Sequence, residues 1–118
     1  MKKINIIKKS KDFDRIIKQR NGKVSKYFII NQEKGNDTKT MFGITFVKHI
    51  GNAVTRNKLK RRTKSIIDNN NFMYLNSKNY IIIIKKEATN ASYNELESDL
   101  KELFLKIKEK QNEEQKTK

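Results

Sequence analysis

The residues from Lys48 to Lys64 most constrain what this chain can fold into, because they combine dense positive charge with a narrow apolar edge. The segment holds seven basic residues and no acidic residue. Asn52 is a favourable N-cap residue, since its side-chain oxygen can accept a hydrogen bond from a free first-turn N–H. Helical spacing links four residues into one edge: Leu59, Thr63, Ile66 and Ile67. We expect a helix that starts after Asn52, ends within 69–71 and packs by this edge.

The charge on this expected helix is of one sign throughout. Lys/Arg-rich helices are often simply solvated faces, but a solvated face normally mixes both signs. Like charges four residues apart cost a few tenths of a kcal/mol per pair, and three such pairs occur here: Arg56–Lys60, Lys58–Arg62 and Lys60–Lys64. We interpret the helix as a surface that meets a polyanion.

The charge of the whole chain is unevenly placed. The 118 residues carry a formal net charge of +15, and all of it lies in residues 1–26, with a net charge of +8, and 48–64, with a net charge of +7. A heavily charged partner, nucleic acid above all, is the simplest explanation. An anionic membrane surface is the alternative, but it would favour Trp, Phe or Leu opposite the basic face, and the chain has no Trp.

Periodicity predicts the remaining elements. Residues 1–9 are expected to form a basic extended arm, and Ser10 to cap a first helix that carries Phe13, Ile16 and Ile17 on one face. Three β-rich runs predict strands: Lys26–Gln32, Thr40–Val47 and Asn79–Lys85. The second strand is expected to run antiparallel to the first, and the four isoleucines of the third to place it inside the sheet.

Alternation along the second predicted strand separates two faces. The bulkier face, with Phe42, Ile44 and Phe46, is expected to join the core. The other face is expected to be an exposed binding surface, and it contains Met41, Gly43, Thr45 and Val47.

The last helix has the clearest signals. Ser92 and Glu95 fit a capping box, and five apolar residues then recur on one face: Leu96, Leu100, Leu103, Phe104 and Ile107. Residues 108–118 lack such periodicity and are expected to be a disordered tail. We therefore predict one α+β domain over residues 1–107, with a mixed sheet and the order α-β-β-α-β-α.

The chain is poorly equipped for catalysis by itself. It has one histidine, His49, and no cysteine, and Asp68 is the only acid near the basic helix. We expect no catalytic residue and no metal site in the protein. No segment matches a signal peptide or a membrane span, so we expect a cytoplasmic protein.

The run from Gly51 to Arg62, GNAVTRNKLKRR, closely resembles the signature of the bacterial ribonuclease P protein subunit. The resemblance extends over nearly the whole chain, from KDF at Lys11–Phe13 to YIII at Tyr80–Ile83 and the last helix. Lys58 and Lys64 stand where the family usually has arginine, and His49 where lysine is common.

This resemblance implies a ribosomal-protein-like fold with a left-handed βαβ crossover, an exception to the usual hand. It also implies a partnership with a catalytic RNA subunit that uses Mg²⁺ to remove the 5′ leader from precursor tRNA, with no small-molecule substrate and no membrane. The expected RNA-binding residues are Lys48, His49, Asn52, Arg56, Asn57, Lys58, Lys60, Arg61, Arg62 and Lys64. The expected cleft for the single-stranded leader contains Phe13, Ile17, Ile29, Asn31 and Thr45. A general basic RNA-binding or ribosome-associated protein, with no part in cleavage, is the alternative.

Overall fold

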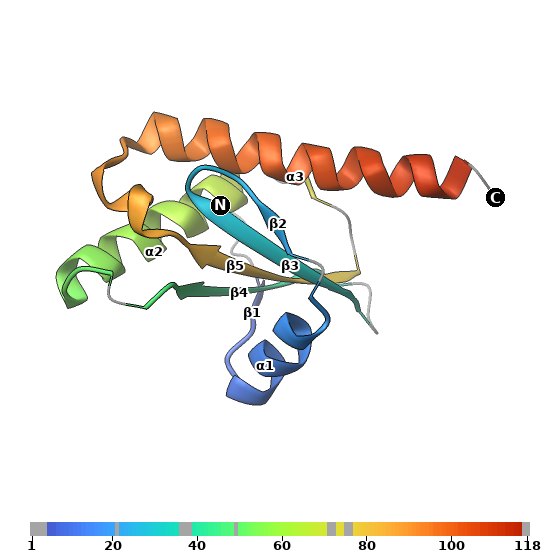
Figure 1. The fold of residues 1–118 in the computed structure, drawn as a ribbon, viewed down its shortest axis with the longest axis horizontal. Helices are drawn as coiled ribbons and strands as arrows, with labels where there is room; N and C mark the ends of the chain where they lie inside the picture. Colours follow the sequence, from blue (N-terminus) through green and yellow to red (C-terminus); the bar gives the residue numbers. More distant parts are fainter. Residues whose placement is uncertain are drawn as a thin grey trace.

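A five-stranded sheet lies between helices on both of its faces (Figure 1). A computed structural model of the chain describes residues 5–20, 22–35, 39–48, 50–70, 73–74 and 77–116, with side chains as far as residue 108. The helices are α1 (Ser10–Lys18), α2 (Ala53–Asn69) and α3 (Tyr93–Lys116), with a short 3₁₀ helix, η2, at Lys86–Asn90. The strands are β1 (Asn5–Ile6), β2 (Lys23–Val24), β3 (Phe28–Lys34), β4 (Met41–Phe46) and β5 (Lys78–Ile84).

The strand order is β1-β4-β5-β3-β2, with β5 at the centre. Strand β5 pairs parallel with β4 and antiparallel with β3, so the sheet is mixed, as the sequence predicts. β3 and β4 run antiparallel to each other, but β5 lies between them. Ile81, Ile82 and Ile84 are fully buried, which confirms that the run of isoleucines forms an internal strand.

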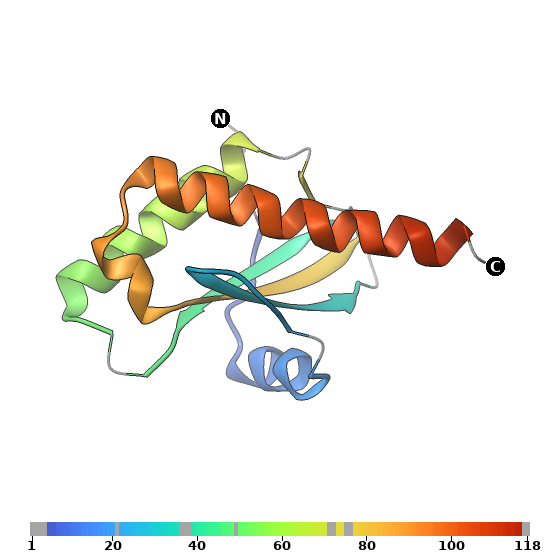
Figure 2. The ribbon, with the colours of Figure 1, turned by 45° about the horizontal axis from the view of Figure 1, so that its top comes forward.

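The larger core lies between the sheet and the pair α2 and α3, which cover the same face (Figure 2). Phe42 of β4 stacks on Tyr80 of β5 with ring centroids 5.6 Å apart, and Tyr80 meets Phe104 of α3 edge-on at 5.2 Å. The five predicted apolar residues of α3 are all buried. A smaller core, centred on Ile7, Ile16 and Ile81, lies on the opposite face beneath α1.

The ends of α2 and α3 follow the sequence signals. Asn52 Oδ1 accepts a hydrogen bond from Thr55 N at 2.9 Å. Ser92 and Glu95 form the reciprocal capping box, with Oγ accepting from Glu95 N at 3.1 Å and the Glu95 carboxylate accepting from Ser92 N at 3.0 Å. The predicted apolar edge of α2 is buried at all four of its residues.

The start of the chain differs in part from its prediction. Residues 5–7 of the basic arm are extended, but they belong to the sheet: β1 pairs with β4, and Ile7 N donates to Phe42 O at 2.7 Å. Ile7 supplies the physical reason, because pairing buries its side chain in the core under α1. The prediction that Ser10 caps α1 is wrong, since Lys9 occupies the N-cap position and makes no side-chain cap bond.

The other end of the chain also differs. Helix α3 continues to Lys116 rather than ending near Ile107. The residues from 108 to 116 contain no Gly or Pro and consist mostly of Lys, Glu and Gln, which are good helix formers even without an apolar face. Hydrophobic periodicity was therefore too strict a criterion for the end of this helix.

The face of β4 that was expected to be an exposed binding surface is exposed only in part. Gly43 is buried, and a Cβ placed on it would lie 2.7 Å from Phe13 Cζ and 2.6 Å from Ile81 Cδ1. The glycine thus allows α1 to approach the sheet closely at this point. Thr45 and Val47 remain partly exposed further along the strand.

Candidate nucleic-acid interface

The outer surface of α2 is cationic along its length. Arg56, Asn57, Lys58 and Arg61 are exposed, and Lys60, Arg62 and Lys64 are partly exposed around the buried edge. Lys48 and the cap residue Asn52 are exposed just before the helix. His49, also predicted to bind RNA, lies outside the described residues.

The basic residues of α2 have few partners within the described part of the chain. Among the described residues, the ion pairs that form lie on α1, η2 and α3 or near them, and none includes a basic residue of α2. Arg62 Nη1 makes one long hydrogen bond, 3.5 Å, to the backbone oxygen of Ala91. A shallow depression of about 490 Å³ lies on the exposed side of the helix, lined by Val54, Asn57, Lys60, Arg61 and Lys64. Phosphate groups could therefore bind here without displacing a carboxylate.

A second surface lies on the face of the sheet that carries α1. The strand register aligns four side chains across it, because Val24 pairs with Ile29, Ile29 with Ile83 and Ile83 with Thr45. We call these four residues the cleft row. Val24 is 63% exposed and the other three are partly exposed, so the row forms an open, mainly apolar strip across β2, β3, β5 and β4.

Helix α1 covers the part of the sheet next to the cleft row. Ile81, Asn31 and Gly43 form the adjoining row and are buried. Phe13 of α1 is partly buried over Gly43, and Ile17, one turn further on, is 37% exposed. The expected leader-cleft residues thus gather on one face, with Ile29 and Thr45 in the open strip and Asn31 buried beside it.

Sequence reasoning missed two members of the cleft row. Ile83 could have been found, since alternation along β5 gives it the same face as Ile81. Val24 lies in a strand of two residues, which is too short for any periodic signal.

A polar network fixes α1 on the sheet. Glu33 of β3 accepts hydrogen bonds from Arg15 Nε at 2.9 Å, Arg15 Nη2 at 3.0 Å, Gln19 Nε2 at 2.9 Å and Asn79 Nδ2 at 3.0 Å. Arg15 also pairs with Asp12 at 2.8 Å. The hydrogen bonds from Arg15 are the main reason that the pKa of Glu33 lies below its ordinary value. This network joins α1, β3 and β5, and so holds α1 against the sheet beside the cleft row.

Replacing Glu33 with glutamine should lower the free energy of unfolding at pH 7 by about 1–2 kcal/mol, because a charged acceptor of several hydrogen bonds becomes neutral. The lowered pKa of Glu33 means that its ionised form stabilises the fold above the unfolded-state value, near 4.5, and that this stability is lost as pH falls through the folded-state value. The difference between wild type and Glu33→Gln should therefore shrink below about pH 4.5 in denaturant titrations at several pH values.

Glu102→Gln on α3 is the matched control for this prediction. Glu102 is 67% exposed and pairs only loosely with Lys106, at 3.5 Å, so its replacement should change stability little. Equal effects of the two substitutions at pH 7 would show that the network around Glu33 does not hold α1.

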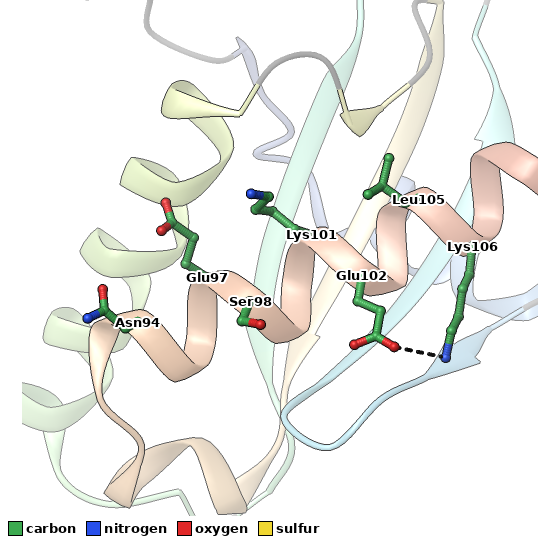
Figure 3. A pocket seen from close by; sticks show the side chains of 7 residues that line it. All are labelled: Asn94, Glu97, Ser98, Lys101, Glu102, Leu105 and Lys106. Atoms are coloured by element: carbon green, nitrogen blue, oxygen red, sulfur yellow. Dashed lines mark ion pairs between the residues drawn. The ribbon is translucent and has the colours of Figure 1, made fainter.

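The outer face of α3 contrasts with α2 in charge. A shallow depression of about 570 Å³ lies there, and its lining mixes both signs, with Glu97, Lys101, Glu102 and Lys106 among its residues (Figure 3). Glu97 accepts a hydrogen bond from Asn70 Nδ2 at 3.1 Å, which ties α3 to the end of α2. These contacts assign α3 to the scaffold.

Two further structural features concern metal ions and membranes. Within the described ranges, no three His, Cys, Asp or Glu residues come together in a way that could hold a metal ion. No helix in that part of the chain is both long enough and apolar enough to cross a membrane.

The fold and the two surfaces define a small α+β protein that carries a cationic helix, whose basic residues form no ion pair within the described ranges, and an open apolar strip beside α1. The family model for ribonuclease P matches residues 1–108. The chain belongs to the ribonuclease P protein family, as its signature predicts. Membership makes it a component of a tRNA-processing endoribonuclease, with an RNA partner in a ribonucleoprotein.

Relatives and solved structures agree with this assignment. The ribonuclease P protein component of Bacillus pumilus is 32% identical over 107 residues, covering 90% of each chain. That of Streptococcus pneumoniae is 32% identical over 100 residues, covering 85% of this chain and 81% of the relative. The Staphylococcus aureus RNase P protein superposes with a TM-score of 0.78 at 29% identity, over 89% of this chain and 95% of that one. The Thermotoga maritima protein shares the fold, with a TM-score of 0.74 at 24% identity over 86% and 96% of the two chains.

Proposed function

We propose that this chain binds the catalytic RNA of ribonuclease P through α2 and holds the single-stranded 5′ leader of precursor tRNA in the cleft beside α1. The observation that carries the proposal is the pairing of two different surfaces in one small fold. One is cationic and lacks internal ion pairs among the described residues, and the other is mainly apolar and open. A structured RNA and an unpaired strand require these two kinds of contact respectively.

The charges of α2 suit a folded RNA. Exposed Arg56, Lys58 and Arg61 offer sequence-independent affinity through contacts to phosphates and release of counterions. Arginine adds a planar fork that can bind one phosphate through two hydrogen bonds.

The cleft row suits a single strand. An apolar floor accepts the faces of unstacked bases whatever their identity. Only Phe13 provides an aromatic ring among the expected cleft residues, so contacts with aliphatic side chains replace most of the stacking. Such a floor fits a subunit that must accept leaders of many sequences.

We also propose a division of chemistry between the protein and the RNA. The protein positions RNA, and hydrolysis of the phosphodiester belongs to the catalytic RNA with its Mg²⁺. The carboxylates of the described chain do not converge into a site for that ion, so the proposal assigns the ion to the RNA and its substrate.

The test is the affinity of the assembled ribonucleoprotein for precursor tRNA with a leader and for mature tRNA without one. We expect the precursor to bind at least about tenfold more tightly, since contact with one base is worth about 1–3 kcal/mol. Val24→Glu should remove most of this advantage, because it places a negative charge at the exposed end of the cleft row, against the phosphates of the leader.

Ser98→Glu on α3 is the matched control, since Ser98 is exposed and the substitution introduces the same charge away from both surfaces. If the ribonucleoprotein binds precursor and mature tRNA with equal affinity while the protein still binds the catalytic RNA tightly, the proposal that the leader lies on the cleft row is wrong. That result would favour the alternative of a general RNA-binding protein, which the cationic surface of α2 alone also supports.

A further inference from the structure

Arg20, the residue after the C-cap of α1, has a left-handed backbone conformation with φ of 53°. A side chain makes this conformation costly, so helices that end in this way usually have Gly or Asn at this position. Asn21 and Gly22 follow directly in the sequence, so a slightly longer helix would have placed a better suited residue there. Backbone strain of this kind is concentrated at functional sites, and the conformation of Arg20 therefore needs an explanation.

Contacts on both sides of Arg20 hold its backbone in this conformation. Before it, Gln19 Nε2 donates a hydrogen bond to Glu33 at 2.9 Å, which fixes the end of α1 on β3. After it, a Cβ built on Gly22 would lie 3.3 Å from Ile29 Cγ2, so the backbone at Gly22 packs directly against β3. The chain turns from the helix onto the sheet between these two contacts, and Arg20 lies in the turn.

Two ordinary explanations do not account for an arginine at this position. A positive charge at the C-terminal end of a helix is stabilising, but Arg15 and Lys18 already supply it in the last turn of α1. The gain from one such charge is smaller than the cost of a left-handed residue with a side chain. An internal ion pair is the other explanation, but the Arg20 side chain is exposed and forms no ion pair with any described residue.

Arg20 lies at one end of the cleft row. Gly22 contacts Ile29 of that row, and two peptide units place the Cα atoms of Arg20 and Gly22 at most about 7.6 Å apart. The long arginine side chain can therefore reach the edge of the row near Val24 and Ile29. The opposite end of the row is at Thr45 on β4, the strand from which the chain continues to α2. Three strand spacings separate the two ends, a length of about 14 Å.

We propose that Arg20 binds a phosphate group of the 5′ leader where the strand leaves the cleft row at β2. Bases that lie on the apolar floor leave their phosphates at its edges, where a guanidinium group can bind one phosphate through two hydrogen bonds. The contact gives a use to part of the net charge of +8 in residues 1–26, which lies outside α2. This inference rests on the proposed function, because it assumes that the leader lies on the cleft row.

The test uses precursor tRNA with a single methylphosphonate linkage, moved along the leader, and bound by the assembled ribonucleoprotein. A methylphosphonate removes the charge of one phosphate. With the wild-type chain, we expect the modification to weaken binding about tenfold at the linkage that meets Arg20, as for the loss of one charged hydrogen bond. With Arg20→Gly, the unmodified precursor should bind about tenfold more weakly, and the same methylphosphonate should have no further effect.

The melting temperature of the free protein provides an independent readout. Arg20→Gly should raise it, because glycine adopts the left-handed conformation without a steric cost. A more stable protein that binds the leader less tightly is not expected if the side chain has only a structural role. Lys106→Ala on α3 is the control, since Lys106 is 70% exposed and its replacement also removes one positive charge. This variant should keep the wild-type sensitivity to methylphosphonate.

The outcomes separate this inference from the proposed function. If the precursor keeps its advantage over mature tRNA and Arg20→Gly binds both as the wild type does, the inference is wrong and the leader still lies on the cleft row. The inference is equally wrong if Arg20→Gly weakens binding of precursor and mature tRNA alike, or if its melting temperature falls. If the wild-type ribonucleoprotein shows no preference for precursor over mature tRNA, both the inference and the proposed function are overturned.

Discussion

Replacing Arg56 and Arg61 together with alanine should lower the affinity of the protein for the catalytic RNA about 100-fold at physiological salt. Both side chains are exposed on α2, and neither forms an ion pair with a carboxylate in the described chain. The substitutions therefore remove contacts to RNA without breaking internal ones. A charged hydrogen bond contributes about 1.5–3 kcal/mol, and two of them account for an effect of this size.

The salt dependence of RNA binding gives a second measure of the contacts that the two substitutions remove. If the wild-type protein neutralises about six phosphates, the logarithm of its binding constant should fall with the logarithm of salt concentration with a slope of about −4 to −5. Removing two contacts should reduce that slope by about 1.5. Filter-binding or fluorescence titrations at several salt concentrations measure both the affinity and the slope.

Lys101→Ala combined with Lys106→Ala on α3 is the control, because it removes the same charge from a face of mixed sign. It should change affinity by only a few-fold, through the long-range field. If the two double variants weaken binding equally, the total charge of the protein matters and α2 is not the RNA-binding surface.

The parts of the fold that the sequence predicted are those with local signals. Asn52 and the Ser92–Glu95 box define the starts of α2 and α3, because capping depends on residues within one turn. The isoleucine run of β5 predicts its central position, because a strand buried on both faces needs apolar residues throughout.

The parts of the fold that the sequence did not predict depend on contacts between residues that are far apart in the sequence. β1 is two residues long and forms because the edge of β4 accepts it. The bonds from Glu33 to Arg15, Gln19 and Asn79 join three elements, and no spacing in the sequence indicates them. The cleft row likewise arises from the register between strands, so only the three-dimensional fold brings Val24, Ile29 and Thr45 into line.

The two surfaces of the candidate site also differ in how far the sequence predicts them. The cationic surface lies on one helix, so the sequence alone predicts it. The structure adds that its basic residues form no ion pair within the described ranges. The expected leader residues came from family resemblance. The structure adds their different environments, with Ile29 partly exposed and Asn31 buried without a partner among the described residues.

The central claim is that this chain helps a catalytic RNA to process precursor tRNA, and its largest expected effect is at low Mg²⁺. Folding and substrate binding by RNA alone require screening of phosphate charge, which Mg²⁺ provides at high concentration. Under the proposed function, the seven basic residues from Lys48 to Lys64 supply fixed positive charge instead, and the cleft row adds contacts to the leader. The protein should therefore matter most where Mg²⁺ is scarce.

The most direct measurement is cleavage of a leader-bearing precursor tRNA by a bacterial ribonuclease P RNA at low Mg²⁺, with and without this protein. We expect little cleavage by the RNA alone and efficient cleavage at the correct 5′ position when the protein is added, with the Arg56→Ala/Arg61→Ala variant far less effective. The account would be contradicted if the wild-type protein bound the RNA tightly and still failed to restore cleavage.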